Sequence, residues 1–289
     1  MDGDVLTEIG AFPWAGELSG GPYIGCAGWN LSSAVQEYFP EEGSHLERYA
    51  AVFPAVEINT SFYRPHRPAT YARWHDSVPD AFRFSAKIPK EITHELRLRN
   101  VEPALRKFIG EVSHLGEKLD CLLVQLPPRL QYDASTAERF FHALRELTPV
   151  AIVCEPRHAT WFSDAAAATL AGHDIAYVTA DPPVAPPPEC AHAARTIYLR
   201  LHGSPHVYHS AYSEEELDRI ADGIEHDTLA GKSVWCVFDN TASGAAVPNA
   251  LALLDRLRRA LASGAGRVGA AAGALDHGHR AIRLRNDLR

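Results

Sequence analysis

Residues able to move protons lie at the ends of short apolar runs in this sequence. Glu57 interrupts AVEI, Glu155 closes VAIVCE and His202 closes TIYLRLH. A general acid or base needs a pKa that its surroundings can move toward the working pH, and carboxyl and imidazole groups offer this. We therefore interpret Glu155 and His202 as candidate proton-transfer groups, with Glu57 as a second catalytic carboxylate.

Cationic side chains accompany these groups. Lys87 follows FRFSA, Arg157 lies two residues after Glu155, and Arg200 lies two residues before His202. Several cations at one site favour an anionic ligand, so Arg157 and Arg200 are predicted to bind the anion. Lys87 is predicted to be an electrostatic clamp at the same site, and a nucleophilic role is open to it if it is desolvated.

Strands must position these residues, and eight β-like runs are present. They cover residues 23–28, 55–61, 82–88, 121–126, 150–155, 175–180, 196–202 and 234–240. Most are separated by segments long enough for a helix, such as 137–147, whose apolar residues recur at helical spacing. This alternation predicts a single-domain α/β protein, a (β/α)₈ TIM barrel. An open doubly wound sheet is the alternative, but no G-x-G-x-x-G follows the first strand.

The polar residues share one face of these strands. Side chains on a strand alternate between two faces, so Val56 and Ile58 point to the helices while Glu57 and Asn59 point to the barrel axis. The same alternation turns these residues inward: Arg83, Ser85, Lys87, Val153, Glu155, Arg157, Arg200 and His202. Barrel active sites lie at the C-terminal ends of the strands, where most of these residues fall.

A purely structural explanation of the inward charges is also open. Ion pairs such as Glu57–Arg83 or Glu155–Arg200 would form an internal network without any chemistry, because structural ion pairs perturb pKa values as well.

Amides and aromatic residues near the strand ends are predicted to orient the ligand. Trp29, Tyr63 and Trp161 follow strands and have faces that stack on a sugar or a base. The loop NTASGAAVPNA precedes a helix predicted to begin near Pro248, and backbone N–H groups at a helix start suit phosphate. Ordinary turn and cap chemistry is the alternative for that loop. The predicted substrate-binding residues are Asn59, Tyr63, Arg157, Trp161, Arg200, Asn240 and Asn249.

Metal and glycosidase chemistry fit the sequence less well. His202, His206 and His209 lack the H-E-x-x-H spacing that places two ligands on one helix face, so no metal and no cofactor are predicted. Glu57 and Glu155 would suit glycoside hydrolysis. The large glycosidase superfamily with this fold, however, carries its acids on strands 4 and 7, where this sequence has Gln125 and His202.

Composition sets further limits. The chain has 289 residues and a formal charge of −8, which argues against a uniformly basic nucleic-acid binder. No run approaches the roughly 18 apolar residues of a membrane span, and no signal-peptide core is seen, so a cytoplasmic protein is predicted. The five cysteines form no C-x-x-C pair and are predicted to be reduced and buried. Residues 1–21 and 263–289 are predicted to be flexible extensions of a barrel spanning 22–262.

Seven motifs carry a resemblance to a known family. They are YIGCAGW, VEINTSFYR, FRFSAKIPKEITH, LLVQLPPRL, CEPRHATW, YLRLHG and FDNTASGAAVPNA. Together, from Tyr23 to Leu261, they resemble the YecE-like family, also called domain of unknown function 72. The resemblance implies a TIM barrel similar to that of the AP-endonuclease (endonuclease IV) type. The family more often has asparagine where this chain has Asp239, so an amide-specific role is not carried over to that residue.

These observations predict an enzyme, with hydrolysis and isomerisation both open, that applies acid–base chemistry at the barrel mouth. Its predicted partner is a small anionic, phosphorylated substrate and not a membrane. Two alternatives from other classes remain. One is a nucleic-acid-binding barrel, whose many phosphate contacts would make binding steeply salt-dependent. The other is a non-catalytic protein that binds a small ligand.

Overall fold

Eight parallel strands form the centre of the computed structural model, which describes residues 22–186, 188 and 194–264. The strands are β1 Tyr23–Cys26, β2 Ala55–Ile58, β3 Arg83–Lys87, β4 Leu119–Gln125, β5 Ala151–Glu155, β6 Ile175–Asp181, β7 Thr196–Leu201 and β8 Ser233–Phe238. They pair in the order β1-β8-β7-β6-β5-β4-β3-β2. All eight coincide with the predicted runs, and the predicted α/β (β/α)₈ barrel is confirmed.

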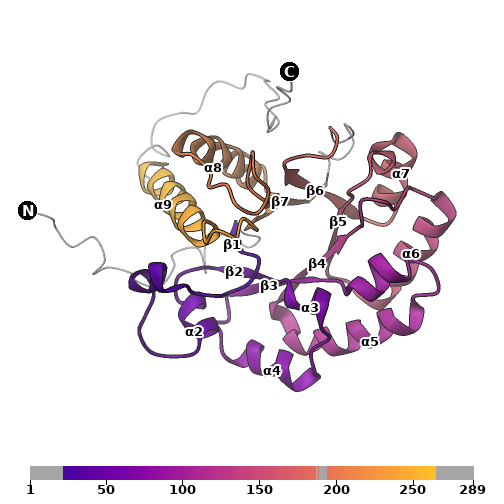
Figure 1. Cartoon of the computed structure of the whole chain (residues 1–289), viewed down its shortest axis with the longest axis horizontal. Coiled ribbons are helices and arrows are strands. Elements are labelled where there is room, and N and C mark those ends of the chain that lie inside the picture. Colours follow the sequence, from indigo (N-terminus) through magenta and orange to yellow (C-terminus); the bar gives the residue numbers. More distant parts are fainter. Residues whose placement is uncertain (1–21, 187, 189–193, 265–289) are drawn as a thin grey trace, which may run out of the picture.

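Helices cover the outside of the strands (Figure 1). The α-helices are α2 His45–Ala50, α3 Thr60–Tyr63, α4 Pro68–Asp76, α5 Glu102–Val112, α6 Ala134–Leu147, α7 Asp164–Gly172, α8 Glu214–Leu229 and α9 Ala246–Gly264. The 3₁₀ segments are η1 Ser33–Tyr38, η3 Ser113–Lys118 and η4 Ala159–Phe162, and η2 Glu91–Glu95 is a π-helix. In the described part of the chain no helix joins β6 to β7, in keeping with the proline-rich sequence there.

The barrel closes between β1 and β2 through a single parallel bridge, Ala27 to Glu57. Next to this bridge the Tyr49 hydroxyl replaces missing strand pairing. It accepts a hydrogen bond from the Cys26 N–H at 2.8 Å and donates one to the Ala55 carbonyl at 3.1 Å. Buried backbone groups need partners, so this hydroxyl completes the closure of the barrel.

Two apolar clusters confirm the predicted alternation of faces. Val56, Ile58, Cys154 and Leu199 belong to the larger cluster, which also contains the buried faces of the helices. The smaller cluster fills the barrel axis with Ala55, Cys121, Leu123, Val153, Ala176, Val178, Tyr198, Trp235 and Val237. Along most strands the inward residues are therefore apolar in the lower layers, whereas β3 contributes Ser85. The polar residues follow them at the C-terminal ends.

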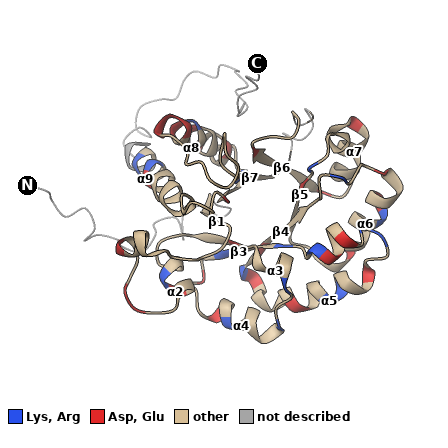
Figure 2. Ribbon diagram, viewed as in Figure 1, with Lys and Arg blue, Asp and Glu red and all other residues tan. Residues whose placement is uncertain are grey.

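Helix starts and surface charge follow local rules. Asp133 caps α6 by accepting a hydrogen bond from the Thr136 N–H, and Ser213 forms a capping box with Glu216 at the start of α8. Lys and Arg lie alongside Asp and Glu on outer helices such as α4 and α5 (Figure 2). The outer surface of these helices thus carries charges of both signs.

Several expectations concern the ends and thiols of the chain. The predicted extension 1–21 and nearly all of 263–289 lie outside the described residues, although α9 continues to Gly264. Four cysteines, at positions 26, 121, 154 and 236, are buried and free, while Cys190 lies outside the described residues. Over the described residues, none of the helices combines the length and apolar character that a membrane crossing requires.

Candidate functional site

A layer of charged side chains caps the apolar interior at the C-terminal ends of the strands. We call it the polar layer, and it consists of Glu57, Lys87, Glu155, Arg157, Arg200, His202 and Asp239. Three carboxylates thus face three permanent or potential cations and one imidazole. The residues come from β2, β3, β5, β7 and the segments directly after β5, β7 and β8, so they meet only because the barrel closes.

Arg200 is the centre of the polar layer and is fully buried. Its guanidinium donates to both oxygens of Glu57 at 3.0 and 2.8 Å and to Glu155 Oε2 at 3.2 Å. It also lies 2.9 Å from Asp239 Oδ2. Burial opposes its charge, but the three carboxylates outweigh burial and raise the pKa of Arg200 well above its usual value. The contacts therefore assign Arg200 to the carboxylates and do not support its predicted role as an anion-binding residue.

His202 is held on both sides. Its Nε2 lies 2.9 Å from Glu155 Oε1 and 2.8 Å from Arg157 Nη2, and its Nδ1 lies 3.0 Å from Asp239 Oδ2. The Nδ1 contact is a charge contact only, because Nδ1 has no hydrogen-bond partner among the described residues. At Nε2 the donor Arg157 and the acceptor Glu155 make opposite demands on the ring nitrogen. His202 is 0% exposed, so neither nitrogen faces open space. Its position suits a relay or positioning role better than direct contact with a substrate.

Glu155 and Asp239 are held in their ionised forms. Burial by itself would raise the pKa of Glu155, but Arg200, the hydrogen bond from His202 and Arg157 hold it below the usual range. The pKa of Asp239 is lowered against the same effect of burial by Arg200, His202 and Lys87. A carboxyl group that stays ionised cannot deliver a proton near neutral pH. The arrangement therefore does not support Glu155 as a general acid, and Glu155 instead orients His202 and Arg157.

Glu57 is tied as tightly. Besides its two bonds from Arg200, its Oε2 accepts a hydrogen bond from the Tyr198 hydroxyl at 2.9 Å. That hydroxyl also lies 3.0 Å from Ser85 Oγ, and it can accept from one partner while donating to the other. Glu57 is fully buried and its oxygens are satisfied, so its contacts are those of a structural carboxylate.

Lys87 differs from every other cation of the layer. Only 4% of it is exposed, yet across the described chain its ammonium has no hydrogen-bond or ion-pair partner and instead lies 4.2 Å from the centre of the Phe62 ring. Burial, followed by repulsion from Arg200, lowers the pKa of Lys87 from 10.5 to about 8. Lysine near this pKa exchanges its proton close to neutral pH. The surroundings of Lys87 thus bring its pKa toward neutral pH.

Other unsatisfied atoms lie at the same end of the barrel as Lys87. Among the described residues, six buried side-chain atoms lack a hydrogen-bond partner, and they include Asn59 Oδ1, Arg157 Nε and Asn240 Oδ1. These three follow β2, β5 and β8 directly. Unpaired buried polar groups are rare in native proteins and call for an explanation. A ligand that offers both acceptors and donors would satisfy them.

Asn249 has a structural role. Its Oδ1 accepts from the Tyr212 N–H and from Asn240 Nδ2, both at 3.0 Å, and its Nδ2 donates to the Tyr212 carbonyl at 3.2 Å. Asn240 Nδ2 also donates to the Ser210 carbonyl at 3.0 Å. These bonds fix the loop after β7 against α9, so only the Asn240 carbonyl oxygen is left for a ligand, and Asn249 has no free group.

The predicted aromatic ligand contacts separate into two cases. Trp161 is 1% exposed, its indole N–H donates to the Leu130 carbonyl at 2.9 Å, and it packs edge-on against Tyr132. The structure thus uses it as a core residue. Tyr63 is 67% exposed at the end of α3, and its ring meets Phe62 edge-on. Trp29 packs edge-on against Trp74.

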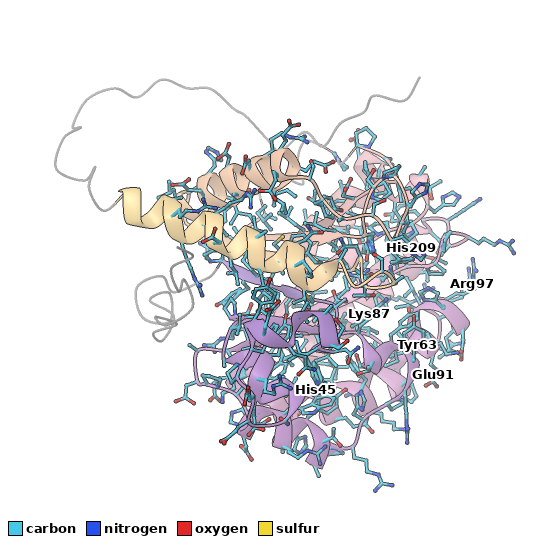
Figure 3. All side chains as sticks on the ribbon, turned by 60° about the vertical axis from the view of Figure 1, so that its left-hand side comes forward. His45, Tyr63, Lys87, Glu91, Arg97 and His209 are labelled. Atoms are coloured by element: carbon cyan, nitrogen blue, oxygen red, sulfur yellow. The ribbon has the colours of Figure 1, made fainter. Side chains whose placement is uncertain are left out.

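Arg83 and Lys87 lie at opposite ends of the same strand, β3. In Figure 3, Tyr63, Glu91 and His209 lie toward one side of the molecule, and Lys87 is labelled nearer its centre. Arg83 begins β3 and therefore lies at the opposite end of the barrel from Lys87; its guanidinium donates to the carbonyls of Asp80 and Phe82. Consequently Arg83 does not pair with Glu57, and the alternative Glu57–Arg83 network is excluded.

The predicted phosphate loop is exposed. Residues 241–244 are all exposed, and α9 begins at Ala246, two residues before the predicted start. Two of its groups bond to the loop after β7: the Ala242 N–H donates to the Tyr208 carbonyl, and the Ser243 hydroxyl donates to the His209 carbonyl. The loops after β7 and β8 are therefore joined to each other.

Three residues in or next to the polar layer were not among the predicted site residues. Asp239 completes the ring of carboxylates, and the family motif FDN indicated its position without its partners. His94 lies in the motif KEITH, on the π-helix after β3; burial, followed by repulsion from Lys87, lowers its pKa. Tyr208 has φ 69° and places its ring edge-on to His202, at 5.6 Å between centroids. No sequence pattern signalled Tyr208.

The polar layer is not arranged as a metal site. Within residues 22–186, 188 and 194–264, no group of three or more His, Cys, Asp or Glu side chains is arranged to hold a metal ion. The four acidic and imidazole groups of the polar layer are instead bridged by Arg200 and Arg157, whose charges would repel a cation. The residues here fit an ion-paired site.

Comparison with known proteins agrees with this architecture. The chain resembles UPF0759 protein YecE of Escherichia coli K12, with 32% identity over 105 residues that cover 36% of this chain and 37% of the relative. It also resembles UPF0759 protein YunF of Bacillus subtilis 168, with 25% identity over 150 residues that cover 49% and 52%. The chain thus aligns with about a third to a half of the length of these curated relatives.

Solved structures match over most of the barrel. A DUF72 family protein from Thermotoga maritima MSB8 has a TM-score of 0.66 and 25% identity, covering 83% of this chain and 98% of that chain. A DUF72 family protein from Enterococcus faecalis V583 has a TM-score of 0.67 and 19% identity, covering 82% and 95%, which shows the shared fold. The family described as "Protein of unknown function DUF72" matches residues 23–268. Since that match spans nearly the whole described barrel, the chain belongs to the DUF72 family, as its sequence motifs predicted.

Proposed function

We propose that this protein is an enzyme that performs acid–base chemistry on a small, hydroxylated anion at the C-terminal mouth of its barrel. The observation that carries the proposal is the ammonium of Lys87, on a side chain only 4% exposed, which has no ion-pair or hydrogen-bond partner among the described residues. It lies at the same end of the barrel as the unsatisfied atoms of Asn59, Arg157 and Asn240. A chain that buries a charge without a partner loses several kcal/mol of stability. Such a cost is typical of groups kept for function.

The free groups define the ligand. Lys87 and the Arg157 Nε–H donate, so they suit a carboxylate or phosphate oxygen of the substrate. The Asn59 and Asn240 carbonyl oxygens accept, so they suit hydroxyl groups on the same molecule. A small anion with hydroxyl groups, such as a sugar acid or a sugar phosphate, matches both requirements.

Lys87 takes the catalytic role in this proposal. With a pKa of about 8 it accepts a proton from a substrate carbon or oxygen and returns it from its ammonium form. Glu155, His202 and Asp239 act as positioning residues: they hold Arg157 in place and give Lys87 a charge-balanced surrounding. Isomerisation and hydrolysis both remain compatible with a base in this position.

A polyanion fits the mouth less well. Lys87, Arg157 and Arg200 are matched by Glu57, Glu155 and Asp239, so the polar layer has no net charge when His202 is neutral. Nucleic-acid binding relies on an excess of cations facing the phosphates. The nucleic-acid alternative is therefore not favoured for this mouth.

The first test is the chemical reactivity of Lys87. Lysines would be acetylated with labelled acetic anhydride between pH 6 and 10 and followed by peptide mass spectrometry. Exposed Lys90 and buried Lys118, whose ammonium donates to the carbonyls of His75 and Val78, are internal references. We expect Lys87 to react with a pH midpoint near 8, and to be protected by gluconate, glucose 6-phosphate, acetate or inorganic phosphate. A Lys87 as inert as Lys118 at every pH would refute an accessible base.

The second test separates an enzyme from a binding protein. Each protecting anion would be incubated with enzyme in D₂O and followed by proton NMR. Loss of a C–H signal or appearance of a product, absent with Lys87→Met, is expected for acid–base catalysis. A ligand that protects Lys87 and stays unchanged would instead support the non-catalytic ligand-binding alternative.

A further inference from the structure

A second concave surface lies on the same face of the barrel as the polar layer but uses none of its residues. This groove has a volume of about 420 Å³ and is formed by the segment after β3, the segment after β4, the start of α6 and Trp161 after β5. Three of its lining residues are arginines: Arg97, Arg99 and Arg129. We call it the arginine groove. Volumes of this size are common for small-molecule sites.

The backbone of the first segment is strained in a way that presents the arginines. After the π-helix η2, Arg97, Leu98 and Asn100 have φ values of 51°, 66° and 53°. A left-handed conformation costs about 1–2 kcal/mol for each such residue. Leu98 is buried and its N–H donates to the Ile92 carbonyl at 3.1 Å, which anchors the turn. Arg97 and Arg99, on either side of Leu98, are exposed.

The two loops of the groove are tied together. Arg97 Nη2 donates to the backbone carbonyl of Arg129 at 2.9 Å, so the side chain of one loop is fixed to the main chain of the other. Figure 3 labels Arg97 on the same side of the molecule as Tyr63, Glu91 and His209. A hydrogen bond therefore holds together the two loops that carry the arginines, on the same side of the molecule as the barrel mouth.

Charge in the groove is strongly unbalanced. Among the described residues, none of Arg97, Arg99 and Arg129 has a carboxylate within 4.0 Å. The acidic residue that lines the groove, Asp133, already accepts hydrogen bonds from the Thr136 N–H and the Ser135 hydroxyl. The Asp133 carboxylate also caps the start of α6, and Arg99 contributes to lowering its pKa, so the groove lining carries two more positive than negative charges. Arginine forks suit phosphate oxygens.

The rest of the lining is apolar and aromatic. Leu130, Ala137 and Trp161 form its buried side, and Tyr132 is half-buried with its hydroxyl held 2.8 Å from Thr169 Oγ1. A ligand with a charged end and a flat or apolar body would match both parts of the lining. Trp161 was predicted to stack on the substrate at the barrel mouth. In the structure it lines the buried side of this separate groove.

We propose that the arginine groove binds the diphosphate group of a small ligand, such as a nucleoside diphosphate. The three arginines offer forked donors to the oxygens of a diphosphate group. The body of the ligand rests against Tyr132 and the exposed edge of Leu96, which also lines the groove. The proposal is independent of the reaction at the polar layer, because the two sites share no residue.

Calorimetric titration of the full-length chain with pyrophosphate, ADP and a 12-nucleotide single-stranded DNA tests it. The variant Arg99→Gln/Arg129→Gln removes two groove charges and leaves the Arg97 link between the loops intact. The control Arg106→Gln/Arg139→Gln removes two exposed arginines from α5 and α6 outside the groove lining. We expect pyrophosphate or ADP to bind, at least tenfold more weakly to the groove variant and within twofold of wild type for the control.

Three results would overturn the proposal. These are no binding of pyrophosphate or ADP at 5 mM, an equal loss in both double variants, and binding of the DNA alone. An equal loss of affinity would show that the ligand responds only to the overall electrostatic potential of the surface. Binding of the DNA alone would show that the groove is a nucleic-acid-binding surface. Lys87→Met separates the two sites: it should leave diphosphate binding within twofold, whatever it does to chemistry at the mouth.

Discussion

Replacing Lys87 by methionine should stabilise the protein near neutral pH. Methionine keeps the length and the contact with Phe62 but removes the charge of a side chain that is 4% exposed and unpaired among the described residues. The pKa of Lys87 falls from 10.5 to about 8 on folding. That difference corresponds to about 3 kcal/mol at 1.36 kcal/mol per pKa unit. We expect Lys87→Met to gain up to this amount in free energy of unfolding at pH 7.

The sign of the pH dependence follows from proton binding. Between pH 8 and 10.5 the unfolded chain holds the Lys87 proton and the folded chain does not, so this group makes wild-type stability rise with pH in that window. At pH 9.5 the cost of Lys87 should have fallen to about 1.4 kcal/mol. The advantage of the variant over wild type should therefore shrink by about 2 kcal/mol between pH 7 and 9.5.

Urea denaturation of wild type and Lys87→Met at pH 7 and pH 9.5 measures both quantities. Lys90→Met is the matched control, because the Lys90 ammonium is exposed and lies 3.2 Å from Glu95. Such surface pairs contribute about 0–1 kcal/mol, so the control should change little at either pH. A Lys87→Met variant that is destabilised at pH 7, with a difference from wild type that does not depend on pH, would show that Lys87 is paired in solution and would refute the reasoning.

Two further changes test the polar layer and the barrel closure. Arg200→Met should lower the free energy of unfolding by about 3–5 kcal/mol at pH 7, because it leaves buried carboxylates without their shared partner. A loss under about 1 kcal/mol in a urea titration would contradict the central role of Arg200. Tyr49→Phe should cost about 1–3 kcal/mol, because the Cys26 N–H and the Ala55 carbonyl both lose their partner. Tyr71→Phe is its control: the Tyr71 hydroxyl is buried without a partner, so its removal should be neutral or stabilising in the same assay, and equal losses for both variants would argue against the closure by Tyr49.

The polar layer combines structural and functional properties. Arg200, Glu57 and Glu155 form an internal ion-pair network of the purely structural kind that the sequence analysis kept as an alternative. Arg200 donates hydrogen bonds to both carboxylates of this network. Lys87 lies beside that network with an ammonium that the network does not satisfy. A fully structural layer would have no reason to keep such a group, which is why the proposed chemistry centres on Lys87 and not on Glu155.

Local pattern was sufficient for the architecture. Strand alternation has a period of two residues and depends only on the immediate sequence, so the eight strands and the inward direction of Glu57, Lys87, Glu155 and Arg200 were predicted correctly. The order of strands along the chain also predicted the barrel, because parallel strands joined by helices close in sequence order. The family motifs pointed to the same fold.

Pairing within the site was decided only by the tertiary structure. Glu57, Glu155 and Asp239 come from positions far apart in the chain, and their distances to Arg200 exist only once the barrel has closed. That closure uses Arg200 for the carboxylates and leaves Lys87 as the unpaired cation, which no spacing in the sequence indicates. Burial of Trp161 has the same origin, because the depth of a side chain depends on the neighbouring loops and not on its own segment. Sequence determines which groups face the axis, and the three-dimensional arrangement of all the charges together determines which of them remain free to react.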